Sequence, residues 1–323
     1  MIVFRDPAEV PAGFGPSVVA IGKFDGVHAG HRAVLERAKV DAADGARVVA
    51  VTFDRNPLSL LRPELCPEDL IGPTQKLQLL AETGIDATLM LRFDEALASL
   101  EPRVFVERIL VGALGARTVL VGTDFRFGRG GAGTPGILAE LGRELGFRVD
   151  VIDDVRSLAT DRRVSSTWIR ELLAQGDVET AARLLGRPHA VWGEVVHGAK
   201  RGRELGFPTA NLSSDLEGFI PADGVYAGWL VDDVPGEGGS SAAPRRSTRY
   251  PAAISVGSNP TFDDVPARQV EAYVLDETDL DLYGRTVEVQ FTARVRGMVA
   301  FEGIEPLIAQ MTDDVTRVRA LLG

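Results

Sequence analysis

The sequence has little of several features that define whole classes of protein. It has a single cysteine, Cys66, in 323 residues, so no disulfide can form within the chain, and a reducing compartment suits it at least as well as an oxidising one. No apolar run is long enough to cross a bilayer, and residues 1–16 lack the basic start and apolar stretch of a signal peptide. We therefore expect a cytoplasmic protein with no membrane partner.

Positive charge is scarce as well. Lys and Arg total 35 against 46 Asp and Glu, which gives a formal net charge of −11. Proteins that bind nucleic acids hold the phosphate backbone with clustered basic side chains, so this balance argues against a nucleic-acid partner. Local basic pockets for a single nucleotide remain compatible with it. The 45% of hydrophobic and 25% of charged residues are typical of a globular protein.

The chain is longer than a single hydrophobic core usually supports, so we expect two domains. In the first half, short β-branched runs alternate with helical stretches, which is the order of βαβ units in a parallel sheet with helices on both faces. The predicted strands are 17–22, 47–53, 87–91, 118–122 and 148–152, and the predicted helices are 29–43, 74–83, 102–114 and 137–145. Ligands of such folds bind beyond the carboxyl ends of the strands.

After about residue 186 the pattern changes to short strands separated by Gly, Pro and Asp turns. The predicted strands are 189–196, 225–231, 252–256, 269–275 and 286–295. This pattern predicts a small antiparallel barrel or sandwich, followed by a helix over 304–322 with one apolar face. We place the boundary between domains 1–186 and 187–323, and we interpret residues 235–249 as a solvated hairpin loop. The fold class is thus α/β plus β.

A glycine-rich turn follows the first predicted strand. Residues 22–31 end in the pattern His28-x-Gly30-His31, after which a helix is predicted. Glycines let a phosphate approach the backbone, and the start of a helix favours an anion. The two imidazoles would share one side of the first helical turn and could donate hydrogen bonds to a departing pyrophosphate. Taken alone, two histidines three residues apart often form a metal pair or have no function.

The order strand, glycine-rich turn, His-x-Gly-His and helix resembles the nucleotidylyltransferase superfamily. Residues 24–28 resemble more specifically the FMN adenylyltransferase module of prokaryotic bifunctional FAD synthetases. Residues 51–57, 121–128 and 164–170 are similar to three further motifs of that family. In the last of these, Ser165 and Ser166 are suited to cap a helix and Arg170 lies one turn further on, although a capped surface helix would look the same.

The resemblance implies a Rossmann-like first domain that transfers AMP from ATP to FMN and releases pyrophosphate. It implies that His28 and His31 are catalytic and stabilise the transferring phosphates, with no covalent intermediate. The further candidates for nucleotide or flavin binding are Gly22, Phe24, Gly26, Asp54, Asn56, Asp124, Ser166, Thr167 and Arg170. Asp124 replaces the Asn of other members, and an acid beside phosphate is expected to act only through water or Mg²⁺.

A second segment, residues 193–212, is dense in Gly, basic and small polar residues. Such a loop can cover phosphates, and the Thr209 hydroxyl and Asn211 amide can meet Mg²⁺ and a phosphate oxygen. It is not a P-loop, because the Gly-Lys-Ser/Thr ending is absent and a strand pattern follows it. Residues 206–212 resemble the signature of riboflavin kinases. Later motifs of that family are similar to residues 221–227, 254–262, 270–273 and 281–284.

This second resemblance implies that the barrel domain phosphorylates riboflavin to FMN with ATP and Mg²⁺. Glu271 carries over as the general base for the ribityl 5′-hydroxyl, and Thr209 carries over as a metal ligand. The candidates for nucleotide binding are Gly198, Arg201, Arg203, Thr209 and Asn211. Taken alone, Glu271 would be an ordinary strand acid that faces water.

Two alternatives stay open. An adenylyltransferase for another phosphorylated small molecule would explain the first domain but not the second, and a flavin-binding sensor with decayed sites predicts the loss of the histidines or of Glu271. Because the resemblance covers nearly the whole chain, we predict a bifunctional enzyme. Its small-molecule partners are riboflavin, FMN and ATP, and its final product is FAD. The oligomeric state is left open, a homo-oligomer included.

Overall fold

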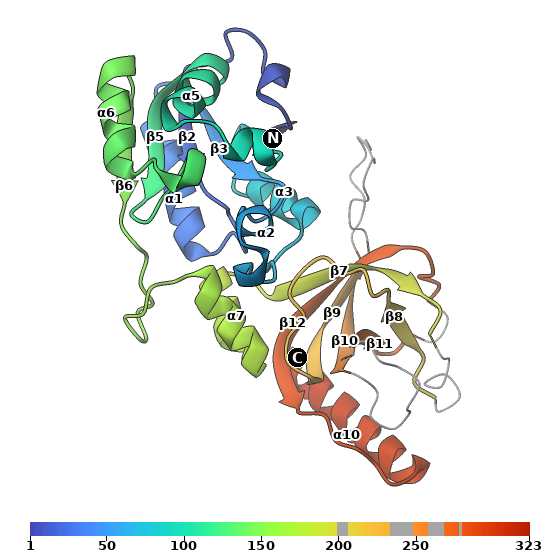
Figure 1. Cartoon of the computed structure of the whole chain (residues 1–323). Coiled ribbons are helices and arrows are strands. Elements are labelled where there is room, and N and C mark those ends of the chain that lie inside the picture. Colours follow the sequence, from blue (N-terminus) through green and yellow to red (C-terminus); the bar gives the residue numbers. More distant parts are fainter. Residues whose placement is uncertain (199–205, 233–247, 258–267, 278–279) are drawn as a thin grey trace. The chain divides into compact units, whose positions relative to one another are not determined.

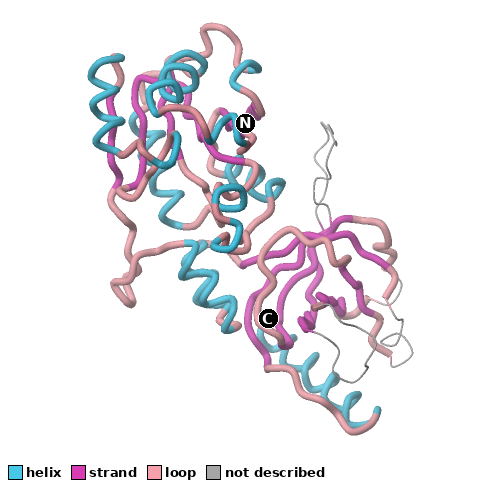
Figure 2. The backbone as a smooth tube through the Cα atoms, in the orientation of Figure 1, coloured by secondary structure: helices cyan, strands magenta, loops and turns pink. Residues whose placement is uncertain are grey.

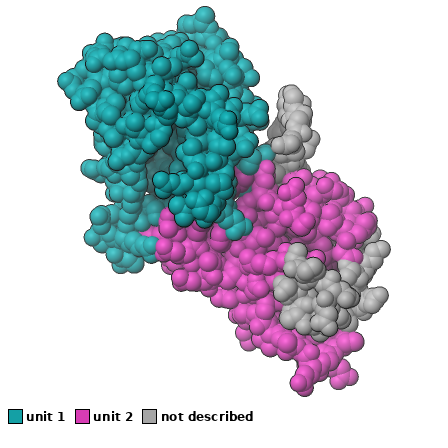
Figure 3. Space-filling view, viewed as in Figure 1, with its two compact units in different colours: residues 1–69, 73–166 teal, residues 70–72, 167–323 magenta. Residues whose placement is uncertain are grey.

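The computed structural model describes residues 1–198, 206–232, 248–257, 268–277 and 280–323, which are coloured in Figure 1 and shown by secondary structure in Figure 2. The chain forms two compact units, residues 1–69 with 73–166 and residues 70–72 with 167–323 (Figure 3). Within the described ranges, no helix combines the length and the apolar character needed to cross a membrane. The domain boundary between residues 186 and 187 stays a prediction, since compactness does not say where each activity ends.

A six-stranded parallel sheet is the centre of the first unit. Its strands are β1 (Ile2–Phe4), β2 (Ser17–Ile21), β3 (Arg47–Phe53), β4 (Ala87–Leu91), β5 (Ala116–Gly122) and β6 (Arg148–Ile152). The strand order is β1-β4-β3-β2-β5-β6, so the chain changes direction across the sheet between β2 and β5. Ligands of open parallel sheets bind at such a switch point, beyond the carboxyl ends of the strands.

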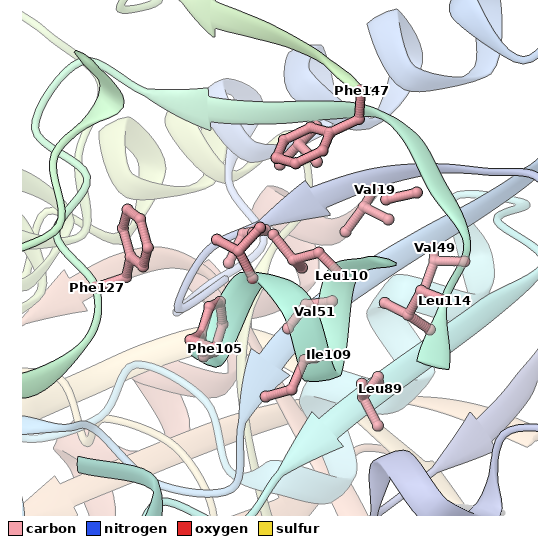
Figure 4. Close-up of a cluster of buried hydrophobic side chains, with 14 of the residues drawn as sticks. Val19, Val49, Val51, Leu89, Phe105, Ile109, Leu110, Leu114, Phe127 and Phe147 are labelled. Carbon is pink, nitrogen blue, oxygen red and sulfur yellow. The ribbon is translucent and has the colours of Figure 1, made fainter. Parts of the chain in front are cut away.

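Helices cover both faces of this sheet. The helical segments are η1 (Pro7–Glu9), α1 (Ala29–Asp41), α2 (Leu58–Leu61), η2 (Pro63–Leu65), α3 (Pro73–Glu82), α4 (Glu95–Ala98), α5 (Pro102–Phe105), η3 (Val106–Ala113), η4 (Arg129–Gly131) and α6 (Pro135–Leu145). On one face, Val19 and Val51 pack with Ile109 and Leu110 of η3 in a buried cluster (Figure 4). On the other face, α1 packs against β2, β3 and β5. Apolar surface is therefore buried on both sides, as parallel sheets require.

Six antiparallel strands close into a barrel in the second unit, in the order β10-β11-β8-β7-β12-β9. They are β7 (His189–Val196), β8 (Thr209–Leu212), β9 (Gly224–Asp232), β10 (Thr248–Gly257), β11 (Gln269–Val274) and β12 (Thr286–Arg296). The accompanying helices are α7 (Ser166–Gln175), α8 (Val178–Leu185) and α10 (Ile304–Leu322). Helix α8 packs on β7 and β12, and α10 packs on β9, β10 and β12.

The structure confirms the predicted fold class: a parallel sheet with helices, an antiparallel barrel and a terminal helix. The predicted strand list lacks β1 and β8, which have only three and four residues, too few for a distinctive alternation. The predicted loop 235–249 lies outside the described residues except for Thr248 and Arg249. These two residues are already part of β10, so the loop ends earlier than predicted.

Candidate active sites

The glycine-rich loop leaves the carboxyl end of β2 along a strained backbone path. Phe24, Gly26 and Val27 have positive φ angles of 51°, 84° and 39°. Such angles are costly for Phe and Val, and they persist where packing holds them, often at functional sites. Here the side chains of Phe24 and Val27 are buried. At the start of the loop, the Gly22 amide donates a hydrogen bond to the Val51 carbonyl of β3 (3.1 Å).

The two histidines of the motif lie together at the start of α1. His28 is the N-cap, and its Nδ1 accepts a hydrogen bond from the His31 amide (3.4 Å). The two rings stack with their centroids 3.7 Å apart. Gly30 permits this arrangement, because a Cβ at that position would lie 3.0 Å from the His28 ring. Since Nδ1 of His28 is an acceptor, the neutral ring carries its proton on Nε2.

The His31 ring is buried in a positively charged setting. Its Nδ1 is buried and has no hydrogen-bond partner among the described residues, and the Phe24 ring lies 5.2 Å away, centroid to centroid. Burial holds the pKa of His31 well below its usual value, and electrostatic interactions with His28, Lys76 and Arg163 act in the same direction. The ring is therefore neutral at neutral pH. An arriving phosphate would offer Nδ1 a partner and favour the protonated ring.

The second phosphate motif begins beside this loop. The Ser166 hydroxyl donates a hydrogen bond to the carbonyl of Asp25 (2.8 Å), so residue 166 is tied to the glycine-rich loop. Thr167 and Arg170, the other predicted members of the motif, belong to the second unit. Their position relative to the histidines stays a prediction.

Asp54 and Asn56 shape the loop that follows β3. One carboxylate oxygen of Asp54 accepts a hydrogen bond from the Phe93 amide (2.9 Å), and the other lies 3.5 Å from the Arg55 guanidinium. Asn56 is buried, and its side-chain oxygen accepts from the Leu58 amide (3.1 Å) at the start of α2. Both side chains thus have structural partners, and their predicted contact with the flavin stays a prediction.

Asp124 has a partner that the sequence analysis does not foresee. Its carboxylate lies 3.0 Å from the guanidinium of Arg163, which also pairs with Asp154 at 3.0 Å. The residue expected to act only through water or Mg²⁺ is therefore neutralised by an arginine. Arg163 in turn lies close enough to His31 to depress the pKa of that ring.

Like Arg163, Lys76 of α3 is a charged group near the histidine site that the sequence motifs do not include. It is only 7% exposed, and its Nζ donates to the Phe53 carbonyl at the end of β3 (3.0 Å). The signal was present in the spacing: Lys76 lies four residues before the buried Leu80, so the two share the apolar face of one helix. A lysine on such a face needs a reason to be there.

The predicted kinase residues meet on two neighbouring strands of the barrel. Glu271 of β11 lies directly opposite Asn211 of β8, and Tyr273 lies opposite Thr209. Alternate residues of a strand share a face, so Glu271, Thr209 and Asn211 point to the same side. The Thr209 hydroxyl donates to Glu271 (3.4 Å), and the Asn211 amide donates to the Thr209 carbonyl (3.1 Å) and hydroxyl (3.3 Å).

The surroundings of Glu271 suit a general base. Burial raises the pKa of the Glu271 carboxyl, and the hydrogen bond from Thr209 opposes that shift. A carboxylate with a raised pKa is better matched to accepting a hydroxyl proton. Gly198 lies against the Asn211 side chain, because a Cβ on Gly198 would come within 2.5 Å of it. The predicted Arg201 and Arg203 lie outside the described residues.

The oxygen atoms of this site fit a magnesium ion. Mg²⁺ prefers hard oxygen ligands, and in kinases it takes only one or two from the protein while substrate phosphates and water supply the rest. The Thr209 hydroxyl and the Asn211 amide oxygen are ligands of that type, on one face of β8. With ATP present, the site can therefore hold Mg²⁺ through Thr209 and the phosphates.

Comparison with known families covers both units. A family model described as FAD synthetase matches residues 12–168, and one described as riboflavin kinase matches residues 185–322. Similar curated proteins are bifunctional riboflavin kinase/FMN adenylyltransferases. The one from Listeria monocytogenes is 37% identical over 94% of this chain and 91% of its own length. Those from Escherichia coli K12 and Bacillus subtilis are 35% and 33% identical, over 95% and 92% of this chain and 93% and 90% of their own lengths.

A solved structure is similar over the same span. It is a crystal structure from Streptococcus pneumoniae, named as a macrolide-efflux protein, with a TM-score of 0.81 and 30% sequence identity. The similarity covers 98% of each chain. The likeness therefore extends to both units, the sheet with its helices as well as the barrel.

Proposed function

Because this chain belongs to the bifunctional riboflavin kinase/FMN adenylyltransferase family, we propose that each activity resides in one of the two sites described above. The chain phosphorylates riboflavin to FMN and adenylylates FMN to FAD, with ATP as co-substrate in both steps. We assign adenylyl transfer to the histidine site, within residues 1–186, and phosphoryl transfer to the Thr209 and Glu271 site, within residues 187–323. The observation that carries the first assignment is the stacked pair of His28 and buried His31 at the start of α1.

In the adenylyl-transfer step, a phosphate oxygen of FMN attacks the α-phosphorus of ATP. The bond from that phosphorus to the bridging oxygen breaks, and pyrophosphate leaves. His28 and His31 stabilise the charge that builds on the departing group, together with the N-terminal dipole of α1. Ser166, Thr167 and Arg170 hold the triphosphate in line for attack. The protein acts through position and charge, and no covalent intermediate is needed.

In the kinase step, Glu271 accepts the proton of the ribityl 5′-hydroxyl as its oxygen attacks the γ-phosphorus of ATP. FMN forms and ADP leaves. Thr209 and Asn211 orient the nucleotide beside Glu271, at the distances that the paired strands impose. Mg²⁺, when bound, neutralises charge on the phosphates during transfer.

A single assay tests the function. The protein is incubated with riboflavin, ATP and Mg²⁺, and the flavins are separated by chromatography over time. We expect FMN first and FAD afterwards, and no product when Mg²⁺ is removed with a chelator. Riboflavin that persists unchanged in the complete mixture would contradict the function.

Variants test the division between sites. Replacing His28 and His31 together should stop the reaction at FMN, whereas Glu271→Ala should block FMN formation and leave the conversion of added FMN to FAD intact. Equal loss of both steps in each variant would show that the two sites are wrongly assigned.

A further inference from the structure

Lys76 is a buried ammonium group whose charge is poorly compensated. Of its three N–H donors, one bonds to the Phe53 carbonyl (3.0 Å), and in the described part of the chain the other two meet no acceptor. Nor does any described carboxylate lie within ion-pair distance of it. Burying a charge without a partner costs several kcal/mol on an order-of-magnitude scale. A residue that carries this cost needs a compensating role.

The charges around Lys76 do not compensate its buried positive charge. Burial is the main cause that lowers the pKa of Lys76, and Asp25, Asp69 and Asp54 oppose it only from a distance. The positive charge of Lys76 also acts on the histidine site, because it lowers the pKa of His31. Two buried polar groups of this unit, the Lys76 ammonium and Nδ1 of His31, thus have unused hydrogen-bonding capacity among the described residues.

Hydrogen bonds at the end of β3 place Lys76 next to the glycine-rich loop. Lys76 bonds to Phe53, the last residue of β3, and the preceding Thr52 donates its hydroxyl proton to the Lys23 carbonyl (3.0 Å). Lys23 belongs to the glycine-rich loop that leads to His28 and His31. The end of β3 thus contacts both Lys76 and the glycine-rich loop, at the edge of the sheet where ligands bind.

We propose that Lys76 is a phosphate-binding residue of the adenylyl-transfer site, whose two remaining N–H groups hold oxygens of a substrate phosphate, either that of FMN or those of ATP. A phosphate would supply both missing acceptors and the missing countercharge, and it would also give Nδ1 of His31 its partner. This inference rests on the proposed location of adenylyl transfer.

Lys39 shows what a structural lysine looks like in the same unit. Its Nζ also donates to a main-chain carbonyl, that of Thr83 (2.9 Å), but it pairs with Glu36 at 2.6 Å as well. Its side chain is 34% exposed, so water reaches the charge. Lys39→Met is therefore a matched control for Lys76→Met, since both remove an ammonium group and a hydrogen bond to a carbonyl.

Steady-state kinetics of FAD formation from FMN and ATP test the proposal. We expect Lys76→Met and Lys76→Gln to lower kcat/KM about 100-fold or more, the range seen when one donor to a reacting phosphate or oxyanion is removed. Lys76→Arg should recover part of the activity, and Lys39→Met should stay within about twofold of the wild type. A larger rise in KM for FMN identifies the FMN phosphate as the bound group, and a larger rise in KM for ATP identifies the triphosphate.

Two further measurements separate binding from support of the fold. We expect Lys76→Met to unfold at a temperature equal to or above the wild type and to keep riboflavin kinase activity, because a buried charge is replaced by an apolar chain. Pyrophosphate should raise the Tm of the wild type but not that of Lys76→Met. FAD formation within twofold of the wild type in both Lys76→Met and Lys76→Gln, or joint loss of stability and kinase activity, would overturn the proposal. A wild-type protein that makes no FAD would instead contradict the proposed function itself.

Discussion

Asp124 and Glu271 show how surroundings set the role of a carboxyl group. Asp124 is exposed and paired with Arg163, so its charge is already neutralised by the protein. Glu271 is largely buried, and its carboxylate accepts a hydrogen bond from the hydroxyl of Thr209. The first arrangement suits a residue that positions a neighbour, and the second suits a residue that exchanges a proton.

Replacing Asp124 by Asn should therefore be mild. The exposed ion pair with Arg163 contributes about 0–1 kcal/mol, so the free energy of unfolding should change by less than about 1 kcal/mol. Adenylyl transfer should keep kcat within about threefold, because Arg163 already neutralises the carboxylate. The kinetics of Asp124→Asn with FMN and ATP check this. A loss of a hundredfold would mean that the acid takes part in the chemistry.

Glu271 should make kcat/KM of the kinase step fall at low pH, which gives the pH profile an acid limb. The base must be deprotonated to act, and burial raises its pKa, so kcat/KM for riboflavin should fall as the pH drops through a value above the ordinary 4.5 of glutamate. A pH profile of FMN formation measures this limb. In Glu271→Gln the rate should drop sharply and the limb should vanish. The same limb surviving in the variant would assign it to another group.

His189 predicts a pH dependence of stability rather than of activity. Its Nε2 contacts the Phe219 carbonyl (2.6 Å). Burial is the main cause that lowers the pKa of His189 to about 4. The hydrogen bond with Phe219 opposes this shift, and the charge of Arg187 adds to it. Below pH 6.5 His189 is protonated in the unfolded chain but stays neutral in the folded chain. The free energy of unfolding is therefore highest above that pH and decreases as the pH falls toward 4. Between pH 7 and pH 5 the loss should be about 2 kcal/mol. Urea unfolding of wild type and His189→Gln checks it, and the variant should show a smaller loss.

Among the elements, α10 is fastened to the barrel by a buried ion pair. Arg296 of β12 donates to both carboxylate oxygens of Asp314 at 2.7 to 3.0 Å, and Gln310 donates to the same carboxylate (3.0 Å). The Asp314 side chain is 5% exposed and that of Arg296 17%. Removing one partner of such a pair leaves the other charge buried and unpaired.

Asp314→Ala should lower the free energy of unfolding by about 3 kcal/mol, because the Arg296 guanidinium loses its countercharge. Its neighbour Asp313 offers the matched control. Asp313 pairs with Arg317 on the exposed side of the same helix (2.9 Å), so Asp313→Ala should cost less than about 0.5 kcal/mol. Chemical denaturation of both variants measures the difference. Equal effects would mean that α10 contributes little to the barrel.

The elements also show how far sequence reasoning reaches. The bounds of α10 and β7 follow from the residue pattern, because an amphipathic period over many residues and an alternating strand are local properties. The pairing of β8 with β11, which brings Thr209 beside Glu271, is a contact between distant segments, and only the family resemblance predicted that these residues act together. The spacing within α3 marks Lys76 as a lysine on an apolar face, but nothing near Lys76 or Arg163 in sequence shows that either acts on His31.

At the scale of the whole molecule, each of the two compact units contains the proposed catalytic residues of one step. The first has its own buried cluster on the parallel sheet, which includes Val19 and Ile21 of β2, the strand that leads into the loop with His28 and His31. The second is a closed barrel whose paired strands hold Thr209, Asn211 and Glu271. Damage to one set should therefore leave the other folded and active.

Mixing two single-site variants tests this independence. His31→Gln should make FMN but not FAD, and Glu271→Gln should convert FMN to FAD but not make FMN. Combined in equal amounts with riboflavin, ATP and Mg²⁺, the two should form FAD after a lag, because FMN released by one chain can bind the other. Chromatography over time follows all three flavins, and each variant alone is the control. No FAD from the mixture, while Glu271→Gln still uses added FMN, would mean that FMN passes between sites without release.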